Sequence, residues 1–400
     1  MTTFAIVFAA IELLAPTEAE TVRLIPEVQR AVLTKETLAE REAVFEADRN
    51  GDRKLRESKD WRTSLPLVLR WRVTEGEQGP WEVKIGKSAD LAGARSWLIR
   101  KDKSVTKDKV EYEFAVPCVN LEIATTYYWQ VSSDITCGKF GHARKCECEG
   151  RKPSHDSAVG SFVTEDLAPR WITIEGSTAR TVGNFRDLGG RIGLGGKRVR
   201  QGLVYRCQGL NDNSVDGRTP GKNRLSVADV EMLTGEMGVR TDLDLRGSGE
   251  TAGMTVSPLG EKVKFIHHSS QAYRGIFTPS GMEVMAKNFR VFCDEANYPI
   301  VFHCIGGADR TGSLAYVLNG VLGVKRAELE TDWESTFYPR IPDQAHAKEP
   351  DYWCRESHFN AGFAKYGDVA TPWNDRIVLY LKDCGITDDE IEKFRSIMLK

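Results

Sequence analysis

Hydrophobic and polar residues alternate along much of residues 65–165. In the stretch LPLVLRWRV, the side chains of Leu67, Leu69, Trp71 and Val73 fall on one face, as in a half-buried strand. The same alternation returns after turn-rich gaps in WEVKIGKS, SWLIRKD, KVEYEFAVP, TTYYWQVSSD and AVGSFVTE. Several short strands at this spacing predict an all-β sandwich.

Helical spacing of apolar residues predicts one helix over residues 26–47, and the pattern changes again after a linker at 165–170. Beyond the linker, strand-like segments (TDLDLR, KVKFIHH, YPIVFHC) alternate with segments of helical period (SVADVEMLTGEMG, GMEVMAKNFRVFCDEA, TGSLAYVLNGVLG). This alternation predicts an α/β domain with a mainly parallel central sheet flanked by helices. Sites in such domains lie at the carboxyl ends of the strands.

Composition narrows the classes of protein. A chain of 400 residues exceeds what one core usually organises, which favours a multidomain protein. With 41% hydrophobic and 28% charged residues, the composition is that of a globular protein. The net charge of -2 argues against a chain-wide basic surface for nucleic acid. No segment approaches membrane-spanning length, so we expect no integral membrane segment.

The first ten residues, MTTFAIVFAA, form an apolar run without Lys or Arg, and Glu12 follows it closely. They are interpreted either as a short or truncated export signal or as a first β-strand. The first interpretation implies a secreted or periplasmic protein, and the second leaves a cytoplasmic location open.

The nine cysteines are an odd number, so at least one thiol is free. A disulfide from Cys137 to either Cys146 or Cys148 would suit an exported hairpin. The CxC pair together with His142 could instead bind a metal ion, or the stretch could be an unlinked polar loop.

The stretch HCIGGADRTG, residues 303–312, lies between a predicted strand and a predicted helix. Gly306 and Gly307 remove side chains from the turn, so that backbone N–H groups at a helix N-terminus can surround a dianion. Arg310 adds a planar guanidinium that can grip two phosphate oxygens. The same positive environment favours the thiolate of Cys304, which makes it a nucleophile suited to attack phosphorus.

These residues resemble the signature loop of the protein tyrosine phosphatase superfamily, and the DRTG ending is similar to its bacterial tyrosine and dual-specificity branch. Two further segments support that branch. GNFRDLGGR, followed by GLVYRCQGL, resembles the NxRDLGG segment that opens the catalytic domain, and GVRTDLDLRGSGE resembles a strand motif of the branch. The three matches occur in the proper order over roughly 175–335.

The resemblance implies a role for several loop residues. Cys304 corresponds to the nucleophile that becomes phosphocysteine, and Arg310 to the residue that binds substrate and spreads transition-state charge. Thr311 corresponds to the hydroxyl that eases expulsion of the thiolate, and His303 to the histidine that orients the loop. The other loop positions that would bind the substrate phosphate are Ile305, Gly306, Gly307 and Ala308.

The general acid has two candidates, since a leaving-group oxygen needs a proton donor within hydrogen-bond reach. Asp309 matches the aspartate of the DRTG loop and is the first candidate, although the adjacent Arg310 opposes its protonation. Asp244, at another strand end, is the second, although it could be a structural carboxylate paired with Arg246.

Three other sets of residues leave alternatives open. Arg186 and Asp187 either brace the loop by ion pairing or belong to the substrate-binding set. Trp333 and Tyr338 either line the mouth of the pocket or pack in the core. Ala308 stands where phosphoinositide-active relatives usually have lysine, which favours phosphotyrosine in a protein or peptide, or a small phosphomonoester.

The leading hypothesis is a cysteine-dependent phosphomonoesterase, a protein tyrosine or dual-specificity phosphatase that needs no metal or cofactor. The alternatives are an inositol phosphate or phosphoinositide phosphatase, including a phytase-like enzyme, and a catalytically silent module that binds phosphorylated ligands. A sulfurtransferase is disfavoured by DRTG.

The N-terminal part resembles another known module. In LEIATTYYWQV, the residues Leu121, Thr125 and Tyr127 are similar to the tyrosine corner of fibronectin type III domains. We therefore expect a fibronectin III-like sandwich with a helical insertion over 11–166, and a catalytic domain over 167–400. The partner of the sandwich is not indicated.

Overall fold

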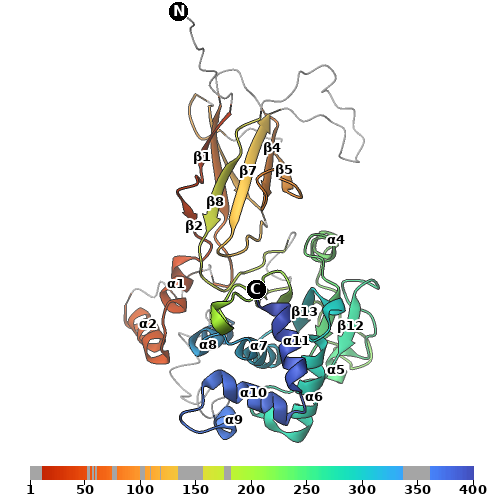
Figure 1. Cartoon of the computed structure of the whole chain (residues 1–400). Helices are drawn as coiled ribbons and strands as arrows, with labels where there is room; N and C mark the ends of the chain where they lie inside the picture. The colour runs from red at the N-terminus through yellow and green to blue at the C-terminus, as the bar shows by residue number, and fades with distance from the viewer. Residues whose placement is uncertain are drawn as a thin grey trace, which may run out of the picture. The chain divides into compact units, whose positions relative to one another are not determined.

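The computed structural model describes residues 11–51, 55, 58, 61–73, 79–99, 104–108, 110–117, 119–133, 156–174, 182–336 and 361–400. The predictions on residues 1–10, on Tyr338 and on the segment with Cys137, Cys146, Cys148 and His142 lie outside these ranges. Internal contacts divide the chain into two compact units (Figure 1). The first comprises residues 1–24 and 65–166, and the second comprises 25–64 and 167–400.

The described part of the first unit consists of strands in two sheets. The strands are β1 (Ile11–Ala15), β2 (Thr21–Val22), β3 (Leu67–Val73), β4 (Trp81–Gly86), β5 (Arg95–Ile99), β6 (Glu111–Val116), β7 (Thr126–Ser133) and β8 (Gly160–Thr164). One sheet has the order β1-β3-β6 and is antiparallel. The other has the order β2-β8-β7-β4-β5, in which β2 and β8 are parallel and the remaining pairs antiparallel.

Aromatic side chains connect the two sheets of the first unit. In β3 the predicted alternation is confirmed, because the four residues predicted to share one face are buried while Arg70 and Arg72 are exposed. The rings of Trp71 and Tyr112 stack at 5.7 Å in one sheet, and Trp81 of the other sheet lies 6.0 and 5.2 Å from them. The inward positions of both sheets therefore share one apolar core.

The Tyr127 phenol contacts nearby backbone. The Tyr127 hydroxyl accepts a hydrogen bond of 2.8 Å from the N–H of Glu122, five residues upstream. The phenol thereby fixes the turn that leads into β7.

The second unit contains the mainly parallel sheet that the sequence predicts. Its strands are β9 (Arg186–Asp187), β10 (Val204–Cys207), β11 (Thr241–Asp244), β12 (Lys264–His267) and β13 (Ile300–His303), in the order β12-β11-β13-β10-β9. All neighbours are parallel except β9 and β10. The carboxyl end of the central strand β13 is therefore the start of the loop at 303–312, as expected for a site in an α/β sheet.

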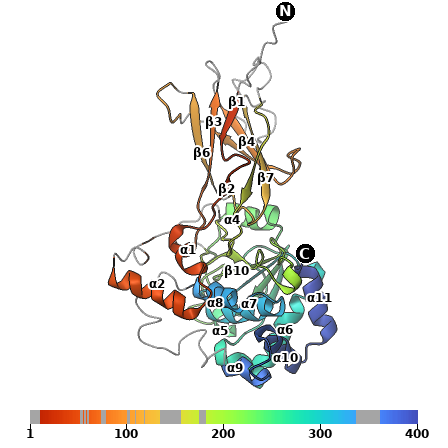
Figure 2. The same cartoon turned by 60° about the vertical axis from the view of Figure 1, so that its left-hand side comes forward.

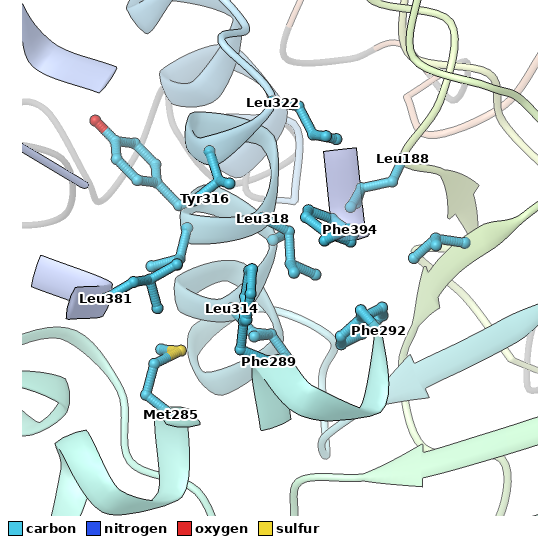
Figure 3. Packing of buried hydrophobic residues seen from close by; sticks show 14 of the residues in the cluster. Leu188, Met285, Phe289, Phe292, Leu314, Tyr316, Leu318, Leu322, Leu381 and Phe394 are labelled. Carbon is cyan, nitrogen blue, oxygen red and sulfur yellow. The ribbon is translucent and has the colours of Figure 1, made fainter. Parts of the chain in front are cut away.

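Helices and short turns follow these strands. They are α4 (Val227–Glu231), α5 (Ser248–Thr251), α6 (Pro279–Val291), α7 (Asp309–Val321), α8 (Arg326–Glu334), α9 (Ala361–Phe363), α10 (Trp373–Asp383) and α11 (Asp388–Met398), with the short 3₁₀ helices η1 (Leu194–Gly196), η3 (Tyr273–Phe277), η4 (Glu295–Asn297) and η6 (Ala364–Tyr366) and the π-helix η2 (Met232–Glu236). Figure 3 shows Leu314 and Leu318 of α7 among Phe289 of α6, Leu381 of α10 and Phe394 of α11, all in one buried cluster. This packing fixes α7, and with it the loop from which α7 begins.

The prediction of a single helix over 26–47 is wrong, because the chain forms two helices there, α1 (Glu27–Leu33) and α2 (Leu38–Asn50). Thr37 caps α2: its hydroxyl accepts from the N–H of Glu40, whose carboxylate accepts from the N–H of Thr37. This reciprocal capping box starts a new helix where the apolar period alone suggested continuation.

Both helices belong to the second unit, where α2 lies beside α8 (Figure 2). The buried guanidinium of Arg41 forms ion pairs of 2.7 Å with Glu330 and 2.8 Å with Glu334, both in α8. The Trp171 indole N–H donates to the side chain of Gln29 at 2.7 Å. The helical segment that the sequence assigns to the sandwich therefore packs in the unit that contains the α/β sheet.

Two further findings concern the described residues only. None of their helices combines the length and the apolar character that a bilayer crossing requires. Nor do three or more His, Cys, Asp or Glu side chains gather there in an arrangement that could hold a metal ion.

Candidate active site

The loop between β13 and α7 joins the central strand to a buried helix. His303 is the last residue of β13, and the thirteen-residue helix α7 begins at Asp309. Gly307 has a φ of 64°, and a Cβ there would lie 2.4 Å from the carbonyl oxygen of Cys207, so the turn requires glycine. Cys304 is only 3% exposed. The loop therefore holds a nearly buried cysteine at a helix N-terminus, where the helix dipole favours an anion.

The carbonyl oxygens of three successive loop residues are all hydrogen-bonded to other segments. The N–H of Gly209 donates to the oxygen of Ile305 at 3.0 Å. The Asn184 amide donates to the oxygens of Gly306 and Gly307 at 3.1 and 3.0 Å. In a planar trans peptide the N–H points opposite to the C=O, so the amide that follows each carbonyl points away from the donor of that carbonyl. Three N–H groups oriented in this way form a concavity suited to a phosphate.

A buried cluster of arginines supports the same loop. Arg206 donates to the carbonyl oxygen of Gly307 at 2.7 Å and to Asp332 of α8 at 2.6 Å. Arg186 and Arg191 each donate to the other oxygen of Asp332 at 2.9 Å. Burial alone would raise the pKa of Asp332, but the three guanidinium groups hold it well below its usual range. One carboxylate thus gathers three cations next to the loop and leaves an excess of positive charge.

His303 lies between two buried carboxylates of β11. Its Nε2 is 3.0 Å from Asp242 Oδ1, and its Nδ1 is 3.8 Å from Asp244 Oδ1. Burial lowers the pKa of His303, but Asp244 and Asp242 outweigh it and raise the pKa to about 8. Asp244 is itself fully buried and ion-paired with Arg246 at 2.6 Å. Burial raises the pKa of Asp244, whereas His303 and Arg246 together bring it below the usual value.

Arg310 is oriented by Glu250 of α5. The two guanidinium nitrogens lie 2.6 and 3.2 Å from the two carboxylate oxygens, which is a bidentate arrangement. The hydrogen bond to Glu250 raises the pKa of Arg310 above its ordinary value. Glu250 also accepts from the N–H of Gly247 and so caps its own short helix. The loop arginine is therefore partly exposed but fixed in direction.

The first turn of α7 carries two more side chains of interest. Asp309 is partly exposed, and one of its carboxylate oxygens accepts a hydrogen bond from the hydroxyl of Tyr273. Thr311 is fully buried, and its hydroxyl has no hydrogen-bond partner among the described residues. A buried hydroxyl in that state is available to a group that enters the loop.

The model of the tyrosine phosphatase family matches residues 178–400 of the chain. The chain belongs to this family. A Cupriavidus necator protein provisionally named as a tyrosine-protein phosphatase is 28% identical over 173 residues, which cover 37% of this chain and 58% of that relative. The chain therefore spans less than two thirds of the length of this relative.

Within this member of the tyrosine phosphatase family, the structure brings Cys304, Arg310, Asp309 and Thr311 together on one loop and the turn that follows. Other predicted site residues, among them Asp244, are buried and not accessible to a substrate at that loop. Asp244 is enclosed, with both oxygens engaged by Arg246. A carboxylate in this position is poorly placed to protonate a leaving group.

Arg186 and Asp187 are likewise fully buried. Asp187 is ion-paired with Arg170 at 2.9 Å and accepts from the N–H groups of Gly189 and Gly202 at 2.8 and 2.6 Å. Burial raises the pKa of Asp187 above its usual value. The location of both residues favours the bracing alternative over contact with substrate. Trp333 is 2% exposed, which favours core packing over the mouth of a pocket.

Several residues of this candidate site were not singled out from the sequence. Three of them, Glu250, Asn184 and Arg206, lie inside the family motifs. The motifs therefore marked these positions, but the residue types alone did not indicate what each side chain does. Asp332 and Tyr273 lie outside those motifs. Only the contacts made in the fold connect them to the loop.

The surroundings of His303 predict a pH dependence of stability. The pKa of His303 is about 8 in the folded chain and about 6.5 in the unfolded chain, so protonation of His303 favours the folded state. This contribution to the free energy of unfolding is fully present below pH 6.5. This contribution, about 2 kcal/mol, should be lost as the pH rises through 8. Urea unfolding at pH 6 and pH 8.5 measures the loss, and the His303→Asn variant should lack it. An equal pH dependence in the variant would show that other groups cause it.

Proposed function

We propose that this chain is a protein tyrosine phosphatase that hydrolyses phosphomonoesters through a phosphocysteine intermediate, with phosphotyrosine in proteins or peptides as substrate. The observation that carries the proposal is the orientation of the loop peptides. Three successive carbonyl groups are hydrogen-bonded to Gly209 and Asn184, which turns the three amides that follow them away from these donors, and we assign the substrate phosphate to the side of the amides. Membership of the tyrosine phosphatase family supports the same reaction.

In the first step, the Cys304 thiolate attacks phosphorus in line with the leaving oxygen, so that an S–P bond forms as the P–O bond breaks. Asp309 gives its proton to the leaving oxygen. In the second step, water attacks phosphorus, Asp309 takes a proton from the water, and the thiolate leaves. Arg310 and the loop amides stabilise the equatorial oxygens in both steps. The Thr311 hydroxyl donates to the departing sulfur.

The choice of Asp309 over Asp244 rests on access. Asp309 is partly exposed in the first turn of α7, whereas Asp244 is enclosed and ion-paired with Arg246. We assign Asp244, with Asp242, to the electrostatic support of His303. We assign Arg186 and Asp187 to support of the loop.

Trapping of the intermediate tests the proposed function. During turnover of a ³²P-labelled phosphotyrosine peptide, an acid quench should leave label bound to the protein at Cys304. The same preparation should hydrolyse phosphotyrosine peptides with a higher kcat/KM than inositol hexakisphosphate, because Ala308 supplies no cation for additional phosphates. A preference for inositol hexakisphosphate would overturn the substrate assignment. Activity without label at Cys304 would overturn the mechanism, and a failure to release phosphate from any ester would indicate a binding module.

Glu250 offers a smaller, independent test of the site. Glu250→Gln preserves size but removes the charge that fixes Arg310, so kcat/KM for a phosphotyrosine peptide should fall about tenfold through misplacement of the guanidinium. Glu283→Gln is the matched control, since Glu283 forms an exposed ion pair with Lys287 in α6. If both variants retain wild-type kcat/KM, the bidentate contact has no part in catalysis.

We further propose that the first unit is a fibronectin III-like sandwich. The two sheets joined through Trp71, Tyr112 and Trp81, and the hydrogen bond at Tyr127, support this assignment. The catalytic domain over 167–400 would then be completed by the helices α1 and α2, which pack in the second unit. Export of the protein stays a prediction from the sequence.

A further inference from the structure

Tyr273 is attached to the first turn of α7 at two points. Its hydroxyl donates a hydrogen bond to Oδ1 of Asp309. Its backbone N–H donates to the Ser313 hydroxyl at 3.1 Å, and that hydroxyl donates to the backbone oxygen of Asp309 at 2.8 Å. The segment after β12 is thereby fastened to both the side chain and the backbone of Asp309.

The position of the tyrosine ring is fixed by packing as well as by the backbone. Tyr273 has a φ of 53°, a left-handed conformation that costs a bulky side chain on the order of 1–2 kcal/mol. Its ring meets the ring of Trp333 edge-on, at 6.2 Å and 81°. Trp333 is itself packed closely against α7, because a Cβ at Gly312 would lie 2.5 Å from its ring. The packing of the ring therefore fixes the direction in which the Tyr273 hydroxyl points at Asp309. The strained backbone conformation of Tyr273 is retained together with this contact.

The hydrogen bond makes the two oxygens of Asp309 unequal. With Oδ1 accepting from Tyr273, the carboxyl group cannot rotate freely, and Oδ2, which accepts no side-chain hydrogen bond from the described residues, is the oxygen available to exchange a proton with a substrate. A proton donor acts efficiently only when it lies within hydrogen-bond reach and in the right direction.

We propose that Tyr273 is a positioning residue for Asp309, which fixes Oδ1 so that Oδ2 faces the reacting oxygen. This inference rests on the proposed function. In the first step the proton on Oδ2 passes to the ester oxygen as the P–O bond breaks and the S–P bond forms. In the second step Oδ2 takes the proton of the attacking water as the O–P bond forms and the S–P bond breaks. Tyr273 itself keeps its proton throughout.

The test uses Tyr273→Phe, which preserves the ring and its contact with Trp333 but removes the hydroxyl. For phenyl phosphate, whose leaving group needs a proton, kcat/KM should fall about 10–100-fold. For p-nitrophenyl phosphate, whose leaving group departs readily as an anion, kcat/KM should change less than threefold. The quantity kcat/KM is chosen because it reports the steps up to cleavage of the P–O bond.

The matched control is Tyr366→Phe, which also removes a tyrosine–aspartate hydrogen bond, from Tyr366 to Asp383 at 2.8 Å. This variant should show wild-type kcat/KM for both substrates. A second comparison places Tyr273→Phe in an Asp309→Asn background, where it should have little further effect, because the proton donor is already absent.

The outcomes separate this inference from the function on which it rests. If the wild-type protein hydrolyses neither ester, the proposed function fails and the role of Tyr273 falls with it. If the wild type hydrolyses both, the inference is overturned when Tyr273→Phe lowers both values equally or lowers neither. It is overturned as well when Tyr273→Phe keeps its full effect in the Asp309→Asn background, since a general structural role would act in that way.

Discussion

Replacing Cys304 by serine should lower kcat for a phosphotyrosine peptide by at least ~10⁴-fold while leaving the affinity for a phosphate-like oxyanion nearly unchanged. A serine hydroxyl at this position remains protonated and is a far weaker nucleophile than a thiolate. The loop peptides that surround the anion are held by Asn184, Arg206 and Gly209, and none of these contacts involves the sulfur. Binding and catalysis should therefore separate in this variant.

The two quantities can be measured on the same preparations. Phosphate release gives kcat, and calorimetric titration with tungstate gives the affinity of the loop for an oxyanion. Cys293→Ser is the matched control, because Cys293 is a free cysteine two residues after α6 and its sulfur donates hydrogen bonds to the backbone oxygens of Phe289 and Glu390. Retention of more than a hundredth of wild-type kcat by Cys304→Ser would exclude the phosphocysteine mechanism. Loss of tungstate binding would show instead that the sulfur is needed to shape the loop.

The elements of the second unit could largely be predicted because their patterns are local. The strand β13 is a run of buried apolar residues, and α7 follows it with a largely buried helical period. The helix break before Thr37 was missed for a different reason. Its capping box with Glu40 was visible in the sequence, but the apolar period appeared to continue across it. The membership of α1 and α2 in the second unit depends on buried contacts of Gln29 and Arg41, which no local pattern encodes.

The residues of the candidate site likewise fall into those that a local motif predicts and those whose role depends on the fold. Cys304, Asp309 and Arg310 are neighbours in the chain, so one motif and the chemistry of its residue types suffice to select them. The roles of Arg186 and Asp244 could not be read from residue type, because an arginine or aspartate in a motif can either contact substrate or support the loop. Their burial favours support. Burial and pairing of this kind arise only when distant segments meet in the fold.

Asp332 is the clearest case of such a distant contact. Among the substitutions considered, Asp332→Asn should lower the free energy of unfolding most. The carboxylate binds Arg186, Arg191 and Arg206, all buried, from segments 126 to 146 residues away. Asparagine leaves the three cations without an anion. Breaking a buried ion pair in this way costs about 3–5 kcal/mol. The free energy of unfolding of the second unit should fall by that amount.

The measurement must report on the unfolding of the second unit alone. Hydrogen exchange of peptides from β13 and α7, followed during urea unfolding, meets this requirement. The control Glu283→Gln removes an exposed i,i+4 ion pair with Lys287 and should cost less than about 1 kcal/mol. Because Arg206 also holds the Gly307 carbonyl, Asp332→Asn should in addition lower kcat in conditions where it remains folded. A variant as stable as Glu283→Gln would mean that another carboxylate takes the place of Asp332, or that the fold does not depend on its charge. The support of the loop at 303–312 would then rest on its hydrogen bonds with Asn184, Arg206 and Gly209 and not on the charge of Asp332.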